Sequence, residues 1–149
     1  PAVNPGISVS RVGGSAQIKA TKKVSGRLRL DLSQYWEIEA FAQFGSDLDS
    51  ATRQQLERGK RLIEVLKQDQ FNPLRISQQI VIIYAAVHGH LDDIDLDKVY
   101  EFEKEIYSLL NSQHADLLDK IETEKDLSDD IVTAIQEIIN DVRKLFVEV

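Results

Sequence analysis

The chain has 149 residues, 42% hydrophobic and 29% charged, which is the range of globular domains and not of disordered chains. It contains no cysteine, which excludes disulfides, thiolate metal sites and a cysteine nucleophile. The formal net charge is −7, but residues 1–30 hold six basic and no acidic side chains, so the remainder carries −13. This acidic remainder argues against binding to duplex nucleic acid, because its surface would repel phosphates.

The first 14 residues are predicted to be extended. Prolines and glycines disfavour a helix at five positions, namely Pro1, Pro5, Gly6, Gly13 and Gly14. Ile7 and Val9 alternate with serines, which is typical of a short strand. No second strand is predicted to pair with it, and a lone strand leaves backbone groups without partners. We therefore expect residues 1–14 to belong to a sheet that lies outside this sequence.

From Ser15 onward the apolar residues recur every three or four positions, which indicates helices. The first helix is expected to end near Phe44, with Gly45 as its left-handed cap. Its buried face is predicted from the spacing of Leu28, Leu32, Tyr35, Ile38, Phe41 and Ala42. A second helix is predicted from Ser46 to Leu66, because carboxylates near its start suit the positive end of the helix dipole.

The segment Ile76–His88 is apolar on nearly every side and is predicted to be the central, most buried helix. Two more helices are expected over Leu96–Leu110 and Ala115–Ile121. The last helix should follow Ser128, with one apolar stripe of Ile131, Ile135, Ile138, Ile139, Val142 and Phe146. The predicted fold class is therefore all-α: residues 15–149 form a bundle of about six helices, preceded by the short extended segment.

Residue types alone mark few sites. His88-Gly89-His90, followed by two aspartates, offers metal-ligating side chains, but the spacing matches no known ligand pattern. We interpret it as a helix end and predict no metal site. Asp47 and Asp49 could be paired acid–base carboxylates, but residues of this kind usually start a helix. The sequence contains no glycine loop that would cradle phosphates.

Arg11 lies in a Ser-Val-Ser-Arg-Val-Gly-Gly run at the basic end of the chain. A single arginine among small residues is usually solvated or paired with an acid. Such a loop also allows the backbone to come close to a ligand or partner. A guanidinium group there is geometrically suited to phosphate.

The run Pro1-Ala2-Val3-Asn4, followed by Ser8 and Ser10, resembles a signature shared by the alpha and beta subunits of F-type ATP synthases. Three longer runs resemble alpha rather than beta, at Ser8–Ala20, Glu39–Thr52 and Leu66–Leu74. The resemblance spans essentially the whole chain. It implies the C-terminal region of the non-catalytic, regulatory alpha subunit, without the N-terminal barrel. Residues 1–14 would be the tail end of the nucleotide-binding domain, and residues 15–149 the C-terminal helical domain.

The resemblance also implies roles for individual residues. Arg11 matches the arginine finger that reaches the catalytic site of a neighbouring beta subunit, where a guanidinium stabilises charge during phosphoryl transfer. Pro1, Gln68 and Gln70 match positions near the adenine of the nucleotide that alpha holds without turnover.

The tip of the first helical hairpin, with Ser46, Asp47 and Asp49, matches the part of the family that faces the central rotor. The implied partners are therefore beta subunits and the gamma rotor subunit. The full subunit would bind ATP or ADP with Mg²⁺, whereas the chain alone is expected to bind no cofactor and to be no enzyme. The parent complex would be a proton-translocating ATP synthase, peripheral on an energy-transducing membrane. It would face the cytoplasm in a bacterium, or the matrix or stroma in an organelle.

An alternative hypothesis is a free-standing helical adaptor that binds an acidic partner through the basic residues 1–30. It predicts binding that weakens with salt, because exposed charges are screened.

Overall fold

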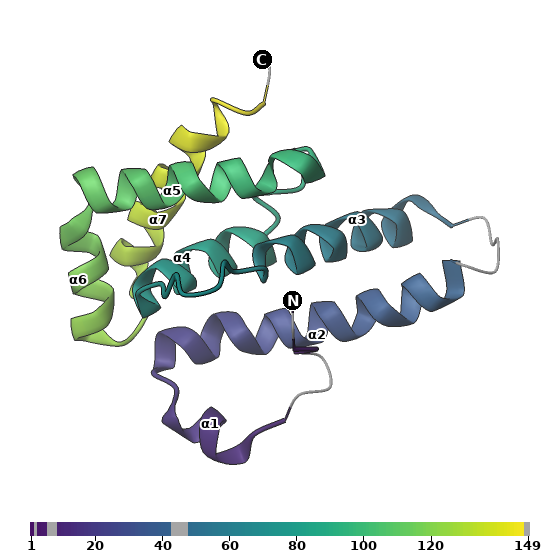
Figure 1. The fold of residues 1–149 in the computed structure, drawn as a ribbon, viewed down its shortest axis with the longest axis horizontal. Helices are drawn as coiled ribbons and strands as arrows, with labels where there is room; N and C mark the ends of the chain where they lie inside the picture. Colours follow the sequence, from purple (N-terminus) through teal and green to yellow (C-terminus); the bar gives the residue numbers. More distant parts are fainter. Residues whose placement is uncertain (2, 6–8, 43–47, 148–149) are drawn as a thin grey trace.

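The computed structural model describes residues 1, 3–5, 9–42 and 48–147, and all its long elements are helices (Figure 1). The α-helices are α1 (Arg11–Ala16), α2 (Lys19–Ala42), α3 (Ser50–Val65), α4 (Ile76–Val87), α5 (Val99–Gln113), α6 (Ala115–Glu124) and α7 (Asp129–Arg143), with a 3-10 turn η1 (Leu96–Lys98) before α5. The prediction of an all-α bundle is confirmed, and α2 to α7 are the helices that the sequence predicted. Within the described ranges, no helix is both long and apolar enough to cross a membrane.

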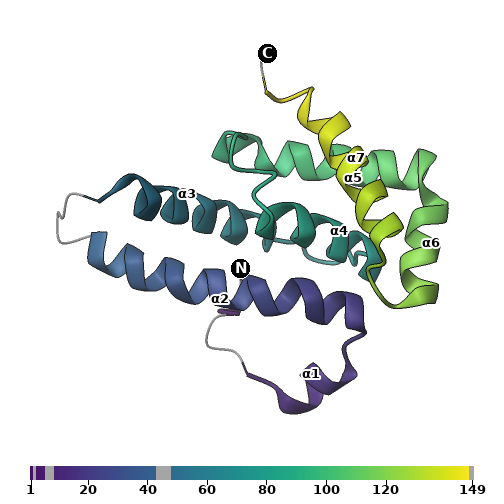
Figure 2. The same cartoon turned by 180° about the vertical axis from the view of Figure 1, so that it is seen from behind.

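Helix α4 is the centre of the bundle, as its apolar sequence predicted. Nine of its 12 residues are buried, and it contacts α2, α3, α5, α6 and α7. Figures 1 and 2 show α2 and α3 side by side as an antiparallel hairpin, with α5 on the other side of α4. Five residues of the predicted stripe are buried in α7, namely Ile131, Ile135, Ile138, Ile139 and Val142, whereas the sixth, Phe146, follows the helix and is partly buried. The core therefore lies where the hydrophobic pattern put it.

The expectation of non-helical backbone up to residue 14 is wrong for Arg11–Gly14, which lie in α1. Local hydrogen bonds compensate for the two glycines. The Ser10 hydroxyl accepts from the Gly13 N–H at 2.9 Å, and the Ser15 hydroxyl donates to the Arg11 carbonyl at 3.0 Å. The expected strand residues Ile7 and Ser8 lie outside the described residues.

The buried face of α2 is shorter than predicted. It comprises Ala20, Val24, Leu28, Leu32 and Tyr35, whereas Phe41 is 62% exposed. The face is shorter because the first half of α3 is polar and its buried residues begin only at Gly59. The expected helix end at Phe44 and Gly45 falls outside the described residues. Helix α3 begins at Ser50, four residues later than predicted, and Asp49 is its cap.

Helices α2 and α3 are in close contact where Gly59 meets Tyr35. A Cβ atom at Gly59 would overlap the Tyr35 ring, and both residues are buried. Only a residue without a side chain leaves room for the ring there. Gly59 is therefore needed for packing and not for an unusual backbone angle.

Substituting Gly59→Ala is expected to lower the free energy of unfolding by about 1–3 kcal/mol, as overpacked cores do. The loss comes despite the better helix propensity of alanine. Gly26→Ala is the matched control in α2, since a Cβ there meets nothing within 4 Å. The control should gain up to about 1 kcal/mol from helix propensity. Urea unfolding followed by circular dichroism measures both, and equal gains in the two variants would contradict the close approach.

Candidate functional site

The loop between α3 and α4 carries both glutamines that the resemblance singled out. The Gln68 side-chain amide donates to the Asn72 carbonyl at 2.7 Å, and the Asn72 N–H donates to the Asp69 carbonyl at 3.3 Å. Phe71 has a positive φ of 62°, a left-handed backbone angle that is uncommon for a residue other than glycine. We call residues 68–72 the glutamine loop. Leu74, two residues after this loop, is joined to α4, because the Gln79 amide donates to the Leu74 carbonyl at 3.0 Å.

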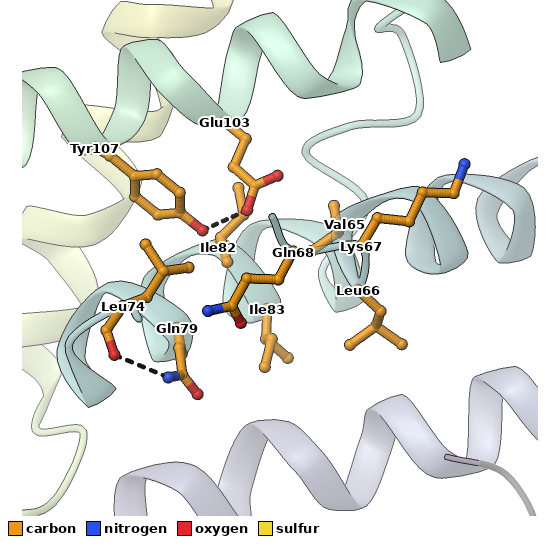
Figure 3. Close-up of a pocket in the computed structure, with 10 residues that line it drawn as sticks. All are labelled: Val65, Leu66, Lys67, Gln68, Leu74, Gln79, Ile82, Ile83, Glu103 and Tyr107. Atoms are coloured by element: carbon orange, nitrogen blue, oxygen red, sulfur yellow. Dashed lines mark hydrogen bonds between the residues drawn. The ribbon is translucent and has the colours of Figure 1, made fainter. Parts of the chain in front are cut away.

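Two small cavities, of about 80 and 70 Å³, lie beneath the glutamine loop. Both are lined by Gln68, Glu103 and Tyr107, and the second also by Asp69 and Tyr100. Figure 3 shows Gln68 extending toward Leu74 and Gln79, with Glu103 and Tyr107 above it on α5. Ligand pockets usually measure about 300–1,000 Å³, so these cavities suit water molecules rather than a nucleobase.

Glu103 carries a buried carboxyl group at this site, and the residue is only 6% exposed. The Tyr107 hydroxyl donates a hydrogen bond to Glu103 Oε1. Burial raises the pKa of Glu103 to about 7, and repulsion from Asp69 and Glu64 adds to this increase, while the Tyr107 hydrogen bond opposes it. Burial likewise raises the pKa of Tyr107. The carboxyl therefore changes charge near neutral pH.

Sequence reasoning missed Glu103, although a signal was present. The predicted apolar face of this helix includes Val99, Phe102 and Ile106. Glu103 lies four residues after Val99 and three before Ile106, so it shares their face of the helix. An acid at such a spacing is a candidate for burial.

The structure brings Gln68 and Gln70 into one loop but does not join Pro1 to them. Gln70 and Pro1 are exposed, and neither lines the two cavities. Of the three adenine-site candidates, only Gln68 has its side chain over a cavity.

Arg11 is the first residue of α1, the short helix that lies apart from the bundle below α2 in Figure 1. All residues of α1 are exposed. Within the described ranges, no acidic side chain forms an ion pair with Arg11. By contrast, Lys23 pairs with Asp126 at 2.6 Å and Arg27 with Asp31 at 3.8 Å. The basic N-terminal stretch is thus partly neutralised within the chain, and Arg11 remains available.

At the tip of the α2–α3 hairpin, the structure describes Asp49 but not Ser46 or Asp47. Asp49 Oδ1 accepts from the Thr52 N–H at 2.9 Å, as the prediction of a helix cap requires. This backbone hydrogen bond lowers the pKa of Asp49 below its usual value. The exposed residue therefore stays negatively charged at neutral pH.

Residues of the segment 88–92, which follows α4, form contacts with other side chains and backbone groups of the chain. His88 is the C-cap of α4, its Nδ1 lies 3.0 Å from the Tyr84 carbonyl, and its ring stacks on that of Tyr84. Gly89 has a φ of +80°, and Asp92 Oδ1 accepts from Arg58 Nε at 3.0 Å. These contacts agree with the interpretation of this segment as a helix end.

The fold and these sites define an all-helical domain in which the described candidates Arg11, Gln68, Gln70 and Asp49 are exposed. The chain belongs to the family described as ATP synthase alpha/beta chain, C terminal domain, which matches residues 17–142. Family membership was expected from the resemblance and is confirmed. Pro1 and Arg11 precede the matched residues.

Two curated relatives are ATP synthase alpha subunits. The subunit of Aquifex aeolicus (strain VF5) is 51% identical over 147 residues, which are 99% of this chain. The subunit of Clostridium botulinum (strain Langeland / NCTC 10281 / Type F) is 51% identical over 146 residues, or 98% of this chain. The match covers 29% of each relative, so the chain spans less than a third of their length.

Proposed function

We propose that this chain is the C-terminal region of the non-catalytic alpha subunit of a rotary, proton-translocating ATP synthase. The observation that carries the proposal is the 51% identity to alpha subunits over 99% of the chain. The chain would pack among beta subunits around the gamma rotor subunit, peripheral on the membrane and on its cytoplasmic side in a bacterium. The adaptor hypothesis has less support, because two of the basic residues that it requires are paired within the chain.

Arg11 is proposed to act at the catalytic site of a neighbouring beta subunit. Arg11 is exposed and is the first residue of a helix in which no residue is buried. Its guanidinium forms no ion pair with a described acidic residue. Phosphoryl transfer spreads negative charge over the equatorial oxygens of the transferred group. A guanidinium offers planar, paired donors for such oxygens. Arg11 would supply this positive charge in trans.

Gln68 and Gln70, together with Pro1, are proposed to contact the adenine of the nucleotide that the full subunit holds. The hydrogen bond of Gln68 to Asn72 uses one amide N–H, which leaves the amide oxygen to accept from an adenine amino group. The amide groups of the loop can exchange hydrogen bonds with the edge of a base. The triphosphate and its Mg²⁺ would be bound by parts of the subunit beyond this chain.

The hairpin tip with Ser46, Asp47 and Asp49 is proposed to face the gamma rotor subunit. Asp49 is exposed and ionised at the start of α3. An acidic tip favours contact with basic rotor residues and sets the register of that contact.

A chimaeric alpha subunit tests the proposal. The matching 29% of the Aquifex aeolicus subunit would be replaced by this chain and expressed with the beta and gamma subunits of that organism. We expect assembly and ATP hydrolysis at a rate similar to the parent complex, because half of the residues are identical. The chain alone should show no ATPase activity. A folded chimaera that does not assemble would contradict the proposal.

A further inference from the structure

One side chain of α5 holds the centre of the glutamine loop. The Tyr100 hydroxyl donates to Asp69 Oδ2 at 2.9 Å, across 31 positions of sequence. Asp69 is the residue between Gln68 and Gln70. A single hydrogen bond therefore fixes the loop between the two glutamines.

The Tyr100 side chain is 43% exposed, but its backbone is held in place by buried neighbours. Tyr100 lies in the first turn of α5 beside Val99, and both Val99 and Phe102 are fully buried, so the backbone at this point is set by the core. The Lys104 ammonium lies 4.2 Å from the centre of the Tyr100 ring. This cation–π contact steadies the ring from the solvent side.

The glutamine loop has little other support. Residues 67–73 are all exposed, and Phe71 is 92% exposed with a left-handed backbone angle. Its other hydrogen bonds, from the Gln68 amide to the Asn72 carbonyl and from the Asn72 N–H to the Asp69 carbonyl, lie within the loop. Such a segment opens locally at low cost unless it is tied to a packed element. The hydrogen bond from Tyr100 joins the loop to helix α5.

We propose that Tyr100 is a positioning residue for the adenine-nucleotide loop: by holding Asp69, it sets the direction in which Gln68 and Gln70 present their amides. This inference rests on the proposed function of the two glutamines. Tyr100 does not touch the nucleotide. It limits the loop to the arrangement that binds the base, so less ordering is required when the nucleotide binds.

Amide hydrogen exchange on the chain itself tests the positioning without any nucleotide. Tyr100→Phe removes only the hydroxyl, and we expect exchange of the Asn72 N–H to become about 3- to 10-fold faster, as the loss of one hydrogen bond implies. Asp69→Ala should give the same increase, and the double variant should add nothing further. Tyr84→Phe is the matched control, since it loses a hydroxyl that accepts from Gln136 at 3.0 Å, away from the loop. Unchanged exchange in Tyr100→Phe would overturn the proposal.

Retention of Mg-ATP by the chimaeric complex tests the consequence for binding. Tyr100→Phe should release nucleotide from the non-catalytic sites about 3- to 10-fold faster while turnover at saturating ATP stays the same. A purely structural defect would instead lower assembly and turnover together. Gln68→Ala distinguishes the role of Tyr100 from the adenine-binding role of the loop. If Gln68→Ala speeds release and Tyr100→Phe does not, the role of Tyr100 is refuted and the proposed function stands. If Gln68→Ala has no effect, the adenine role of the loop itself is refuted.

Discussion

Replacing Arg11 by alanine is expected to slow ATP turnover of the assembled complex by about 10³–10⁵-fold, the range measured for arginine fingers. The residue begins a helix with no buried residues, and its side chain pairs with no described acid. Its loss should therefore leave folding and assembly unchanged. Steady-state ATP hydrolysis by the chimaeric complex measures the first effect, and native gel electrophoresis the second.

Two variants sharpen the Arg11 experiment. Arg11→Lys keeps the charge but loses the paired donors, so its turnover should lie between those of the parent and of Arg11→Ala. Lys22→Ala removes an exposed basic residue of α2 in the same stretch and should have no effect on turnover. Normal turnover in Arg11→Ala would remove this residue from the mechanism.

Glu103→Gln is expected to stabilise the protein above neutral pH and not below pH 5. Burial raises the pKa of Glu103 from 4.5 to about 7 in the folded protein, so the folded state holds the proton more tightly than the unfolded state. The resulting stabilisation is complete below pH 4.5 and is lost as the pH rises through 7. A shift of this size corresponds to about 3 kcal/mol. The glutamine stays neutral at both pH values and can still accept from Tyr107.

Urea unfolding of Glu103→Gln and the parent chain at pH 4.5 and pH 8.5 measures this effect. The difference between the two proteins should grow by about 3 kcal/mol between the two pH values. Glu101→Gln is the control, because Glu101 lies on the exposed face of the same helix. A difference that is equal at both pH values would show that Glu103 is not desolvated.

The hydrophobic pattern predicts the helices well because burial decides most of them. The run from Ile76 to Val87 is apolar on nearly every side and is the centre of the bundle, and the apolar stripe within α7 is buried. The pattern is weaker for α2. Phe41 was assigned to the buried face of α2, but it lies nine residues after Leu32, on the opposite side of the helix, and is exposed.

The short helix α1 was missed because the prediction considered the low helix propensity of Gly13 and Gly14 but not the neighbouring serines. The Ser10 and Ser15 hydroxyls satisfy backbone groups at both ends of its first turn, and they were readable in the sequence. The hydrogen bond between Tyr100 and Asp69 could not be predicted, since it joins segments that only the tertiary fold brings together. Arg11 and Gln68 were singled out by resemblance, not by periodicity.

The contact of Gly59 with Tyr35 fixes the register of α2 against α3. The two helices cannot slip past each other by a turn without driving the ring into a neighbouring side chain. At the end of α2 remote from the tip, the Ala20 N–H donates to the Lys125 carbonyl at 3.0 Å and Lys23 pairs with Asp126. Helix α2, which has 24 residues and is about 36 Å long, therefore spans the distance from the hairpin to the turn between α6 and α7.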